Sequence, residues 1–357
     1  MTRIARIALS GTMVALVAAA ALEGGRESGA AAPERRARPA AVAQRTGSPP
    51  GRPVVLAFAG DVHFEGLLQA KLAAGPERLL APVRPVLERA DLAVVNLETA
   101  ITEAGAAAFK QYTFRAPASA FAALRGGGVD AASMANNHGM DFGEQGLRDS
   151  LAAARRHRFP VIGIGLDDRR AYAPYRRTVR GRRVAVLAAT QVLDDHLIEA
   201  WTAGPGKPGL ASAKDVPRLL AAVRAARASA DTVVVFLHWG VELAGCPTAR
   251  QRRLARQLVR AGADVVVGGH AHRLLGTGRL GRALVSYGLG NFVWYGTSQL
   301  STRTGVLLVT VEGRRVLRYE WVPARIRGGV PHPLTGPERQ AEIEAWHALR
   351  RCTDLRR

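Results

Sequence analysis

The stretch ADVVVGGHAHRLLG (263–276) joins three valines and two glycines to two histidines that stand one residue apart. A continuous apolar run of this kind is typical of a strand covered on both faces. Similar runs recur along the chain and alternate with segments whose apolar residues repeat with a helical period. We therefore predict a layered α/β fold.

The rest of the chain shows the same alternation. We expect strands at 54–60, 91–98, 129–137, 159–165, 182–190, 232–240, 263–270, 283–290, 305–312 and 316–323. Helical periodicity is present at 66–75, 142–158, 215–230 and 249–262. The last strands follow one another without a helix between them, so we expect them to be antiparallel.

The composition allows a sizeable core, because 48% of the 357 residues are hydrophobic. The net charge of +21 would suit a nucleic acid or a membrane surface. Nearly all of the basic residues are arginines scattered along predicted helices, and aromatic residues make up only 6% of the chain. We therefore predict that nucleic acid is not a partner.

The N-terminus resembles an export signal. Arg3 and Arg6 precede an apolar stretch, 7–22, that is short for a membrane span. We predict a signal peptide at 1–22, with an uncleaved membrane anchor as the alternative, and expect a secreted or extracytoplasmic protein. The further organisation that we predict is a disordered Ala/Arg/Pro-rich spacer at 23–52, one domain at 53–325 and a partly helical C-terminal tail at 326–357.

Two cysteines, Cys246 and Cys352, remain in this apparently exported chain. They would form one disulfide that ties the tail to the domain, or they would be two unpaired thiols. Their spacing is not that of a redox or zinc motif.

Polar side chains gather where the predicted strands end. Because the carboxyl ends of parallel strands form the ligand crevice of open α/β sheets, we expect these side chains to share one rim. The residues are Asp61, His63, Glu98, Asn136, Asn137, His138, His238, His270 and His272.

The spacings favour a metal site. In an extended segment, residues two apart point to the same side, so Asp61 would face the same way as His63, and His270 the same way as His272. Mixed carboxylate and imidazole ligands suit Zn, Mn or Fe. With Glu98, Asn137 and His238 the set is too large for one tetrahedral ion, and it suits two ions that act on a phosphoester.

Single residues have simpler interpretations. Asp61 alone would be a turn cap, and His238 alone would be a core histidine. We expect Asp141 to cap the helix that begins near Phe142, and Trp239 to pack in the core. The gathering of the whole set at strand ends favours the metal site.

The motifs resemble those of the CapA-type capsule or poly-gamma-glutamate synthesis proteins, which are related to the calcineurin-like metallophosphoesterases. The resemblance implies a four-layer α/β/β/α sandwich with mixed sheets. It is carried by FAGDVHFEG (58–66), VVNLETAIT (94–102), YTFRAP (112–117), ANNHGMDFGEQGL (135–147), FLHWGVE (236–242), AGADVVVGGHAHRLLG (261–276) and YGLGNFVW (287–294).

The resemblance also implies a role for each residue. Asp61, His63 and His272 would hold a first ion, and Asn137, His238 and His270 a second. Glu98 would stand at the bridging position, where the superfamily has an aspartate. His138 would be the catalytic histidine that assists the leaving group. Asn136 and Asn291 would contact substrate in the same cleft.

Two classes of function follow. The first is a metal-dependent hydrolase of a phosphoester or of a cell-envelope polymer. The second is a non-catalytic accessory subunit for synthesis or export of an anionic polymer, acting with a membrane-bound synthase.

Overall fold

The computed structural model describes residues 52–357. The predicted signal peptide and all but the last residue of the predicted spacer lie outside the described residues. Among residues 52–357, none of the helices has the length and apolar character needed to cross a membrane.

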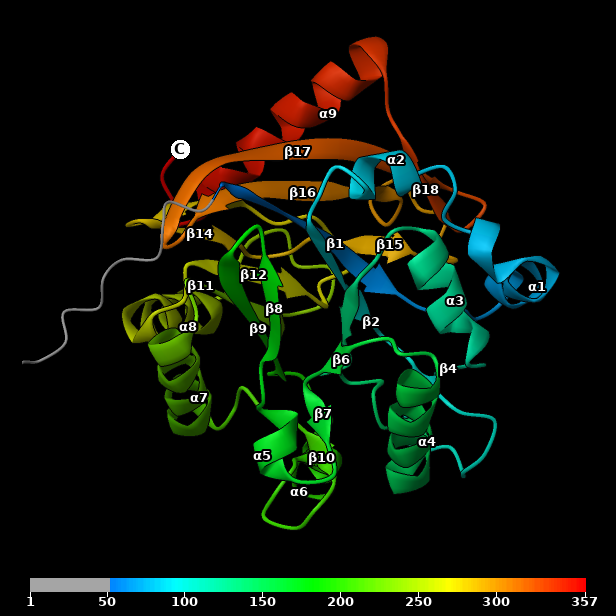
Figure 1. The fold of residues 1–357 in the computed structure, drawn as a ribbon. Helices are drawn as coiled ribbons and strands as arrows, with labels where there is room; N and C mark the ends of the chain where they lie inside the picture. The colour runs from blue at the N-terminus through cyan, green and yellow to red at the C-terminus, as the bar shows by residue number, and fades with distance from the viewer. Residues whose placement is uncertain (1–51) are drawn as a thin grey trace, which may run out of the picture. The chain divides into compact units, whose positions relative to one another are not determined.

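The first of two large sheets has a parallel half and an antiparallel half that meet at β1 (Figure 1). β1 pairs in parallel with β2 and β15, and antiparallel with β16. The strands of this first sheet are β18 (Val330–Pro333), β17 (Arg315–Arg327), β16 (Arg303–Glu312), β1 (Val54–Val62), β2 (Leu92–Leu97), β5 (Ala131–Ser133) and β6 (Val161–Ile162), with β15 (Asn291–Val293) beside β1.

The second sheet has four parallel strands flanked by an antiparallel strand on each edge. Its order is β13 (Thr277–Leu280), β14 (Ala283–Ser286), β12 (Val265–Gly269), β11 (Thr232–His238), β9 (Arg182–Thr190) and β8 (Tyr175–Val179). Two small ribbons complete the strands: β3 (Ala100–Ile101) with β4 (Arg115–Ala116), and β7 (Ile164–Gly165) with β10 (Gly209–Leu210).

Alternation along the strands shows how the layers pack. Leu56 and Phe58 of β1 share a core with Val234 of β11, so this core lies between the two sheets. Ala57 of β1 packs in a separate core with the helices beside the first sheet, and Val235 of β11 packs with those beside the second. The layers are therefore α/β/β/α, which confirms the predicted fold class.

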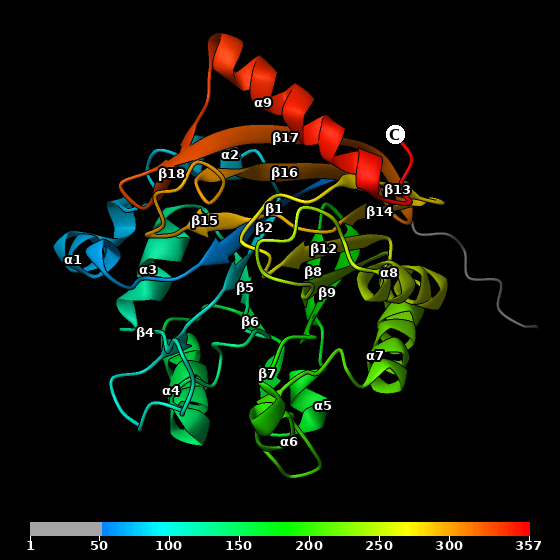
Figure 2. The same ribbon diagram turned by 180° about the vertical axis from the view of Figure 1, so that it is seen from behind.

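Helices cover the outer faces of both sheets (Figures 1 and 2). Those beside the first sheet are α1 (Leu67–Ala74), α2 (Arg84–Leu87), α3 (Ser119–Gly126) and α4 (Gly143–Arg156); those beside the second are α7 (Val216–Ser229) and α8 (Ala249–Ala261). The short helices α5 (Asp168–Ala171) and α6 (Ile198–Trp201) lie near β7 and β10.

The C-terminal segment continues the first sheet. β17 crosses residue 325, where we placed the end of the domain, and β18 pairs with it. Helix α9 (Gly336–Ala348) then packs on β17, with the Trp346 ring stacked 5.3 Å from Trp321. The helix of the predicted tail is thus part of the core between the sheets.

The strand predicted at 129–137 is shorter in the structure, because β5 ends at Ser133. Asn136, Asn137 and His138 follow it in a turn rather than in a strand. Asn136 accepts a hydrogen bond from the backbone N–H of His138, an interaction that competes with strand pairing.

Candidate metal centre

The predicted residues gather at the strand ends of both sheets. β1, β2 and β5 of the first sheet end beside β11 and β12 of the second, as contacts between residues at their ends show. The side chains that this arrangement brings together are Asp61, His63, Glu98, Asn137, His138, His238, His270 and His272.

Asp61 is the point where the two sheets meet. Its Oδ2 accepts the backbone N–H of His270 at 3.0 Å and lies 3.4 Å from Nδ1 of His272. A Cβ atom on Gly269 would lie 2.2 Å from Asp61 Oδ1, so only glycine lets β12 approach β1 this closely.

Asn96, in β2, was not among the predicted site residues, although it orients several candidate metal ligands. Its Nδ2 donates to Asp61 Oδ1 at 2.8 Å and lies 3.1 Å from His238 Nδ1. Its Oδ1 accepts from Asn136 at 3.0 Å. The alternation of β2 offered a signal, because Asn96 lies two residues before Glu98.

Glu98 lies at the centre of the cluster. Candidate ligand atoms of Glu98, His270 and His272 lie within 4.8 Å of one another, and so do those of Asp61, Glu98 and His238. Glu98 belongs to both groups. Each group also joins residues from both of the predicted ligand sets, so these donors form one cluster.

Three buried atoms of this cluster have no hydrogen-bond partner among the described residues: His63 Nε2, Glu98 Oε1 and His270 Nδ1. Leaving such an atom unpaired costs about 1–3 kcal/mol. All three belong to side chains that bind transition metals, so a bound cation would satisfy them. The residues therefore fit a metal site.

The two histidines of GGHAH converge for a different reason from the one we predicted. His270 and His272 are not extended, because they have φ of 91° and 52°. The alternation argument is therefore wrong for this pair, and a turn after β12 brings the ring centroids within 6.0 Å. Positive φ costs energy for residues other than glycine and is characteristic of functional sites.

Aromatic rings hold His63 in place. Its ring stacks 4.8 Å from Phe114 and lies edge-on to Trp294 at 4.1 Å and Tyr295 at 4.6 Å. Glu65 donates its backbone N–H to His63 Nδ1, which directs Nε2 away from the backbone.

His138 belongs to a buried polar chain. Its Nδ1 lies 2.5 Å from Asp141 Oδ2, and Asp141 Oδ1 accepts from Lys110 at 2.9 Å. Lys110 also donates to the backbone oxygen of Asn137. The predicted helix-capping role of Asp141 is wrong, because α4 has Phe142 at its N-cap and no side-chain cap there. Lys110 was not predicted, since it lies in a segment without periodicity.

The remaining predicted residues lie around this cluster. Asn136 is fully buried and donates to Asn96 and to the backbone oxygen of Leu97. Asn291 Oδ1 lies 2.9 Å from His272 Nδ1, and its amide donates to Ser301. Trp239 is buried and donates to the backbone of Tyr287, which confirms the packing role predicted for it.

Burial sets the charge of these groups. It lowers the pKa of His63 and of His270 to about 3, and that of His238 well below its usual value. It raises the pKa of Glu98, an effect that Asp61 strengthens and Lys110 opposes. Burial would also lower the pKa of His272, but its contact with Asp61 raises it. Neutral imidazole is the form that binds metals.

The four layers, with a buried donor cluster at the strand ends, define a fold of the metallophosphoesterase type. The chain belongs to a family described as bacterial capsule synthesis protein PGA_cap, whose model matches residues 55–295. The matched segment runs from β1 to just beyond β15 and includes every residue of the cluster. This confirms the family resemblance seen in the sequence.

Individual proteins show the same relationship. The chain is 29% identical over 286 residues to the PGA biosynthesis protein CapA of Bacillus subtilis, covering 78% of this chain and 73% of that one. It is 29% identical to a probable polyglutamine synthesis accessory protein of Mycobacterium tuberculosis, covering 51% of this chain and only 50% of that one. A hypothetical protein from Thermus thermophilus shares the fold, with a TM-score of 0.50, 19% identity, and 76% of this chain and 100% of that one covered.

Proposed function

We propose that this protein is a metal-dependent hydrolase that cleaves a phosphoester or another bond of an anionic cell-envelope polymer. The observation that carries the proposal is the set of buried atoms on His63, Glu98 and His270 that have no hydrogen-bond partner among residues 52–357. They lie beside Asp61 and His238, so neutral nitrogen donors and carboxylates share a single cluster.

The proposed cofactors are two transition metal ions, Mn, Zn or Fe. Asp61, His63 and His272 would hold one, Asn137, His238 and His270 the other, and Glu98 would contact both. Such ions supply the positive charge that stabilises phosphoryl transfer. Two carboxylates are too few for the charge of two divalent ions, so an anionic substrate would be attracted to the site.

His138 is the proposed catalytic residue. Because Nδ1 faces Asp141, Nε2 is directed toward Glu98, whose Oε1 lies 4.0 Å away. Nε2 is therefore the atom that would hold the proton for the leaving oxygen. Asp141 keeps the ring in this orientation, and Lys110 holds Asp141.

Export is part of the proposal. The N-terminal sequence would direct the chain out of the cytoplasm, where a cell-envelope polymer is accessible. Fractionation of cells that express the full chain, with N-terminal sequencing of the product, tests export and cleavage together. A chain found only in the cytoplasm would contradict it.

Metal analysis and a hydrolysis assay test whether the protein is a metal-dependent hydrolase. The purified full chain is expected to hold Mn, Zn or Fe near stoichiometry and to hydrolyse an activated phosphodiester. His270→Ala is expected to lose at least about 100-fold in rate, whereas His332→Ala, in β18, serves as a control with unchanged rate. Metal-free protein after mild purification, or unchanged hydrolysis in His270→Ala, would contradict the proposal.

The name of the Mycobacterium tuberculosis relative favours a second candidate, an accessory subunit without catalysis. Complementation separates the two functions. If His270→Ala restores surface polymer in a deletion strain as fully as the unaltered chain, the accessory role is supported. If it fails although the protein is stable, the metal site is required.

A further inference from the structure

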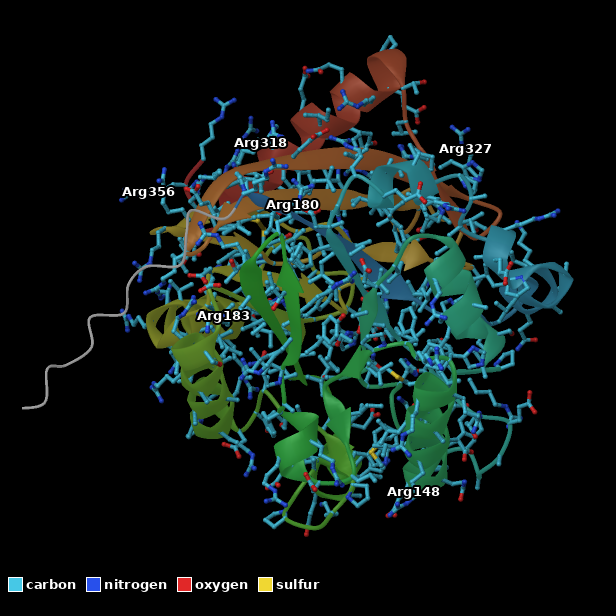
Figure 3. The ribbon with its side chains drawn as sticks, viewed as in Figure 1. Arg148, Arg180, Arg183, Arg318, Arg327 and Arg356 are labelled. Carbon is cyan, nitrogen blue, oxygen red and sulfur yellow. A yellow bond between two sulfur atoms is a disulfide. The ribbon has the colours of Figure 1, made fainter. Side chains whose placement is uncertain are left out.

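Helices α7 and α8 carry an unusual charge. They lie side by side over the second sheet (Figure 1) and together contain eight arginines and neither Asp nor Glu. Arginine side chains project on other sides of the molecule as well (Figure 3), but α4 and α9 also contain acidic residues. In α4, Arg148 forms an ion pair with Glu144. On α7 and α8 the arginines that form ion pairs, Arg218, Arg227 and Arg256, do so only with carboxylates outside the two helices.

On α8 the exposed arginines form a row. Arg250, Arg253 and Arg260, which we call the α8 stripe, follow one another with Gln257 at helical spacing and are all exposed. At a rise of about 1.5 Å per residue the row is about 15 Å long. Among residues 52–357, none of the three has a carboxylate within ion-pair distance, whereas Arg256 pairs with Asp354.

The α8 stripe runs away from the candidate metal centre. β11 ends at His238 in the centre, and the chain then enters α8, which leads back to the start of β12. The two strands are parallel, so α8 runs antiparallel to both. Arg250 is therefore at the end of the sheet nearer the centre, and Arg260 is at the far end.

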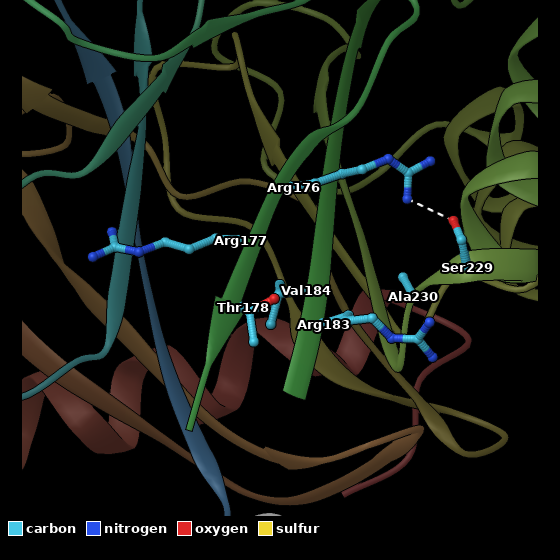
Figure 4. A pocket seen from close by; sticks show the side chains of 7 residues that line it. All are labelled: Arg176, Arg177, Thr178, Arg183, Val184, Ser229 and Ala230. Atoms are coloured by element: carbon cyan, nitrogen blue, oxygen red, sulfur yellow. Dashed lines mark hydrogen bonds between the residues drawn. The ribbon is translucent and has the colours of Figure 1, made fainter. Parts of the chain in front are cut away.

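A recess lined by three more arginines, Arg176, Arg177 and Arg183, begins near the far end of the stripe. Gly262, which follows α8, lies close to the side chain of Arg227. Arg227 in turn donates a hydrogen bond to the backbone oxygen of Ala230, which lines the recess. The recess has a volume of about 400 Å³. Figure 4 shows Arg176 and Arg183 on its sides, with Arg176 donating to Ser229 Oγ at 2.7 Å.

The charges at the recess are only partly balanced. Arg183 forms an ion pair with Asp231, whereas Arg176 bonds to a neutral hydroxyl. Arg177 points away in Figure 4 and pairs with Asp130. Arg176 therefore retains a charge that an anionic group can neutralise.

We propose that the α8 stripe and the recess at Arg176 bind an extended polycarboxylate chain. The planar guanidinium group pairs with a carboxylate through two parallel hydrogen bonds, which a row of arginines can repeat along a polymer. The inference rests on the proposed role with an anionic polymer. It adds a binding surface outside the metal centre, along which the polymer would reach that centre.

The α8 surface does not suit a membrane. A membrane-bound helix inserts apolar side chains between its cations. The large apolar residues on the inner face of α8, Leu254 and Leu258, are buried against the second sheet. The exposed face of α8 also carries no aromatic ring, so base stacking with single-stranded nucleic acid is disfavoured.

A binding titration tests the inference. The probe is fluorescent poly-L-glutamate, titrated by anisotropy against the full chain purified in non-ionic detergent. R250Q/R253Q/R260Q is expected to weaken binding at least about tenfold, and R176Q to weaken it further. The control R78Q/R169Q/R282Q removes the same charge from exposed positions elsewhere and is expected to change affinity less than about threefold.

Two results of the titration would overturn the inference. One is an equal loss of affinity in the two triple variants, and the other is no loss of affinity in R250Q/R253Q/R260Q. So would binding of phosphatidylglycerol vesicles through the α8 stripe without binding of polyglutamate. If the protein holds no metal and hydrolyses nothing, yet binds polyglutamate through the α8 stripe, the proposed hydrolase function is wrong and the inferred binding surface stands.

Discussion

His238 Nε2 lies 2.7 Å from Asn137 Oδ1, although the two residues belong to different sheets. His238 ends β11 of the second sheet, and Asn137 follows β5 of the first. Its other ring nitrogen, Nδ1, lies 3.1 Å from Asn96 Nδ2. The packing of the two sheets thus fixes the orientation of the imidazole ring of a candidate metal ligand.

Asn96 is predicted to orient the metal ligands without binding metal. Asn96→Ala removes the amide that holds Asp61 and His238, so we expect metal affinity to fall about 10–100-fold, as is usual for partners of metal ligands. Competition with a chromophoric chelator measures it. Circular dichroism of the metal-free variant establishes that it is folded. Unchanged affinity in a folded variant would show that Asn96 has no orienting role.

Asp141 is predicted to act through His138. Asp141→Asn keeps the size of the side chain but removes the charge 2.5 Å from Nδ1, so the ring loses its fixed orientation. We expect kcat on an activated phosphodiester to fall about 100-fold or more, with KM and bound metal changed little. Lys110→Arg, which retains the ion pair, is the comparison. A fall in metal content equal to the fall in kcat would assign Asp141 to metal binding instead.

The sequence predicted most of the fold because buried strands and amphipathic helices have distinct periods. The helices predicted at 142–158, 215–230 and 249–262 correspond closely to α4, α7 and α8. β8 was missed because its residues are mostly exposed and include Arg176 and Arg177, a pattern without apolar alternation. β15 was missed because it has only three residues and pairs with a distant strand.

The site was predicted less completely, for a physical reason. Local patterns identify donors at strand ends, but the side chains that hydrogen-bond to these donors lie far away in the sequence. Asp141 and Lys110 lie 31 residues apart, and Asn96 and His238 lie 142 residues apart. The turn at His270 was also hidden, because positive φ in a residue other than glycine has no clear sequence signal.

The stability of the metal-free protein is predicted to fall in acid. His63 and His270 have pKa values of about 3 when folded, against 6.5 for an exposed histidine. Between these values the unfolded chain binds more protons, so the free energy of unfolding decreases as pH drops from about 6.5 toward 3. Each histidine contributes about 1.4 kcal/mol per pH unit to this slope. Urea unfolding in chelator at several pH values measures it.

His63→Phe isolates one of these contributions. Phenylalanine keeps the ring between Phe114 and Trp294 but does not titrate. We expect the slope to decrease by about 1.4 kcal/mol per pH unit. An identical slope in the variant and the unaltered chain would show that His63 is not held neutral by burial.

The disulfide between Cys246 and Cys352 is predicted to hold the segment that follows His238. The sequence left open whether the two cysteines form a disulfide or are unpaired thiols, and the structure shows them bonded. The bond joins the loop before α8 to the 3-10 helix Leu349–Cys352, and so closes a long loop of the chain. Cross-links of this kind stabilise mainly by restricting the unfolded chain.

Cys352→Ser is therefore expected to lower the free energy of unfolding by about 2–5 kcal/mol. A reductant is expected to lower the melting temperature of the unaltered chain to that of the variant, because both changes release the same constraint. Cys246→Ser/Cys352→Ser serves as the control, since it has no bond to reduce. If reductant destabilises this double variant equally, the effect does not come from the disulfide. If it leaves the unaltered chain unchanged while both cysteines become reactive toward a thiol reagent, the bond contributes nothing to stability.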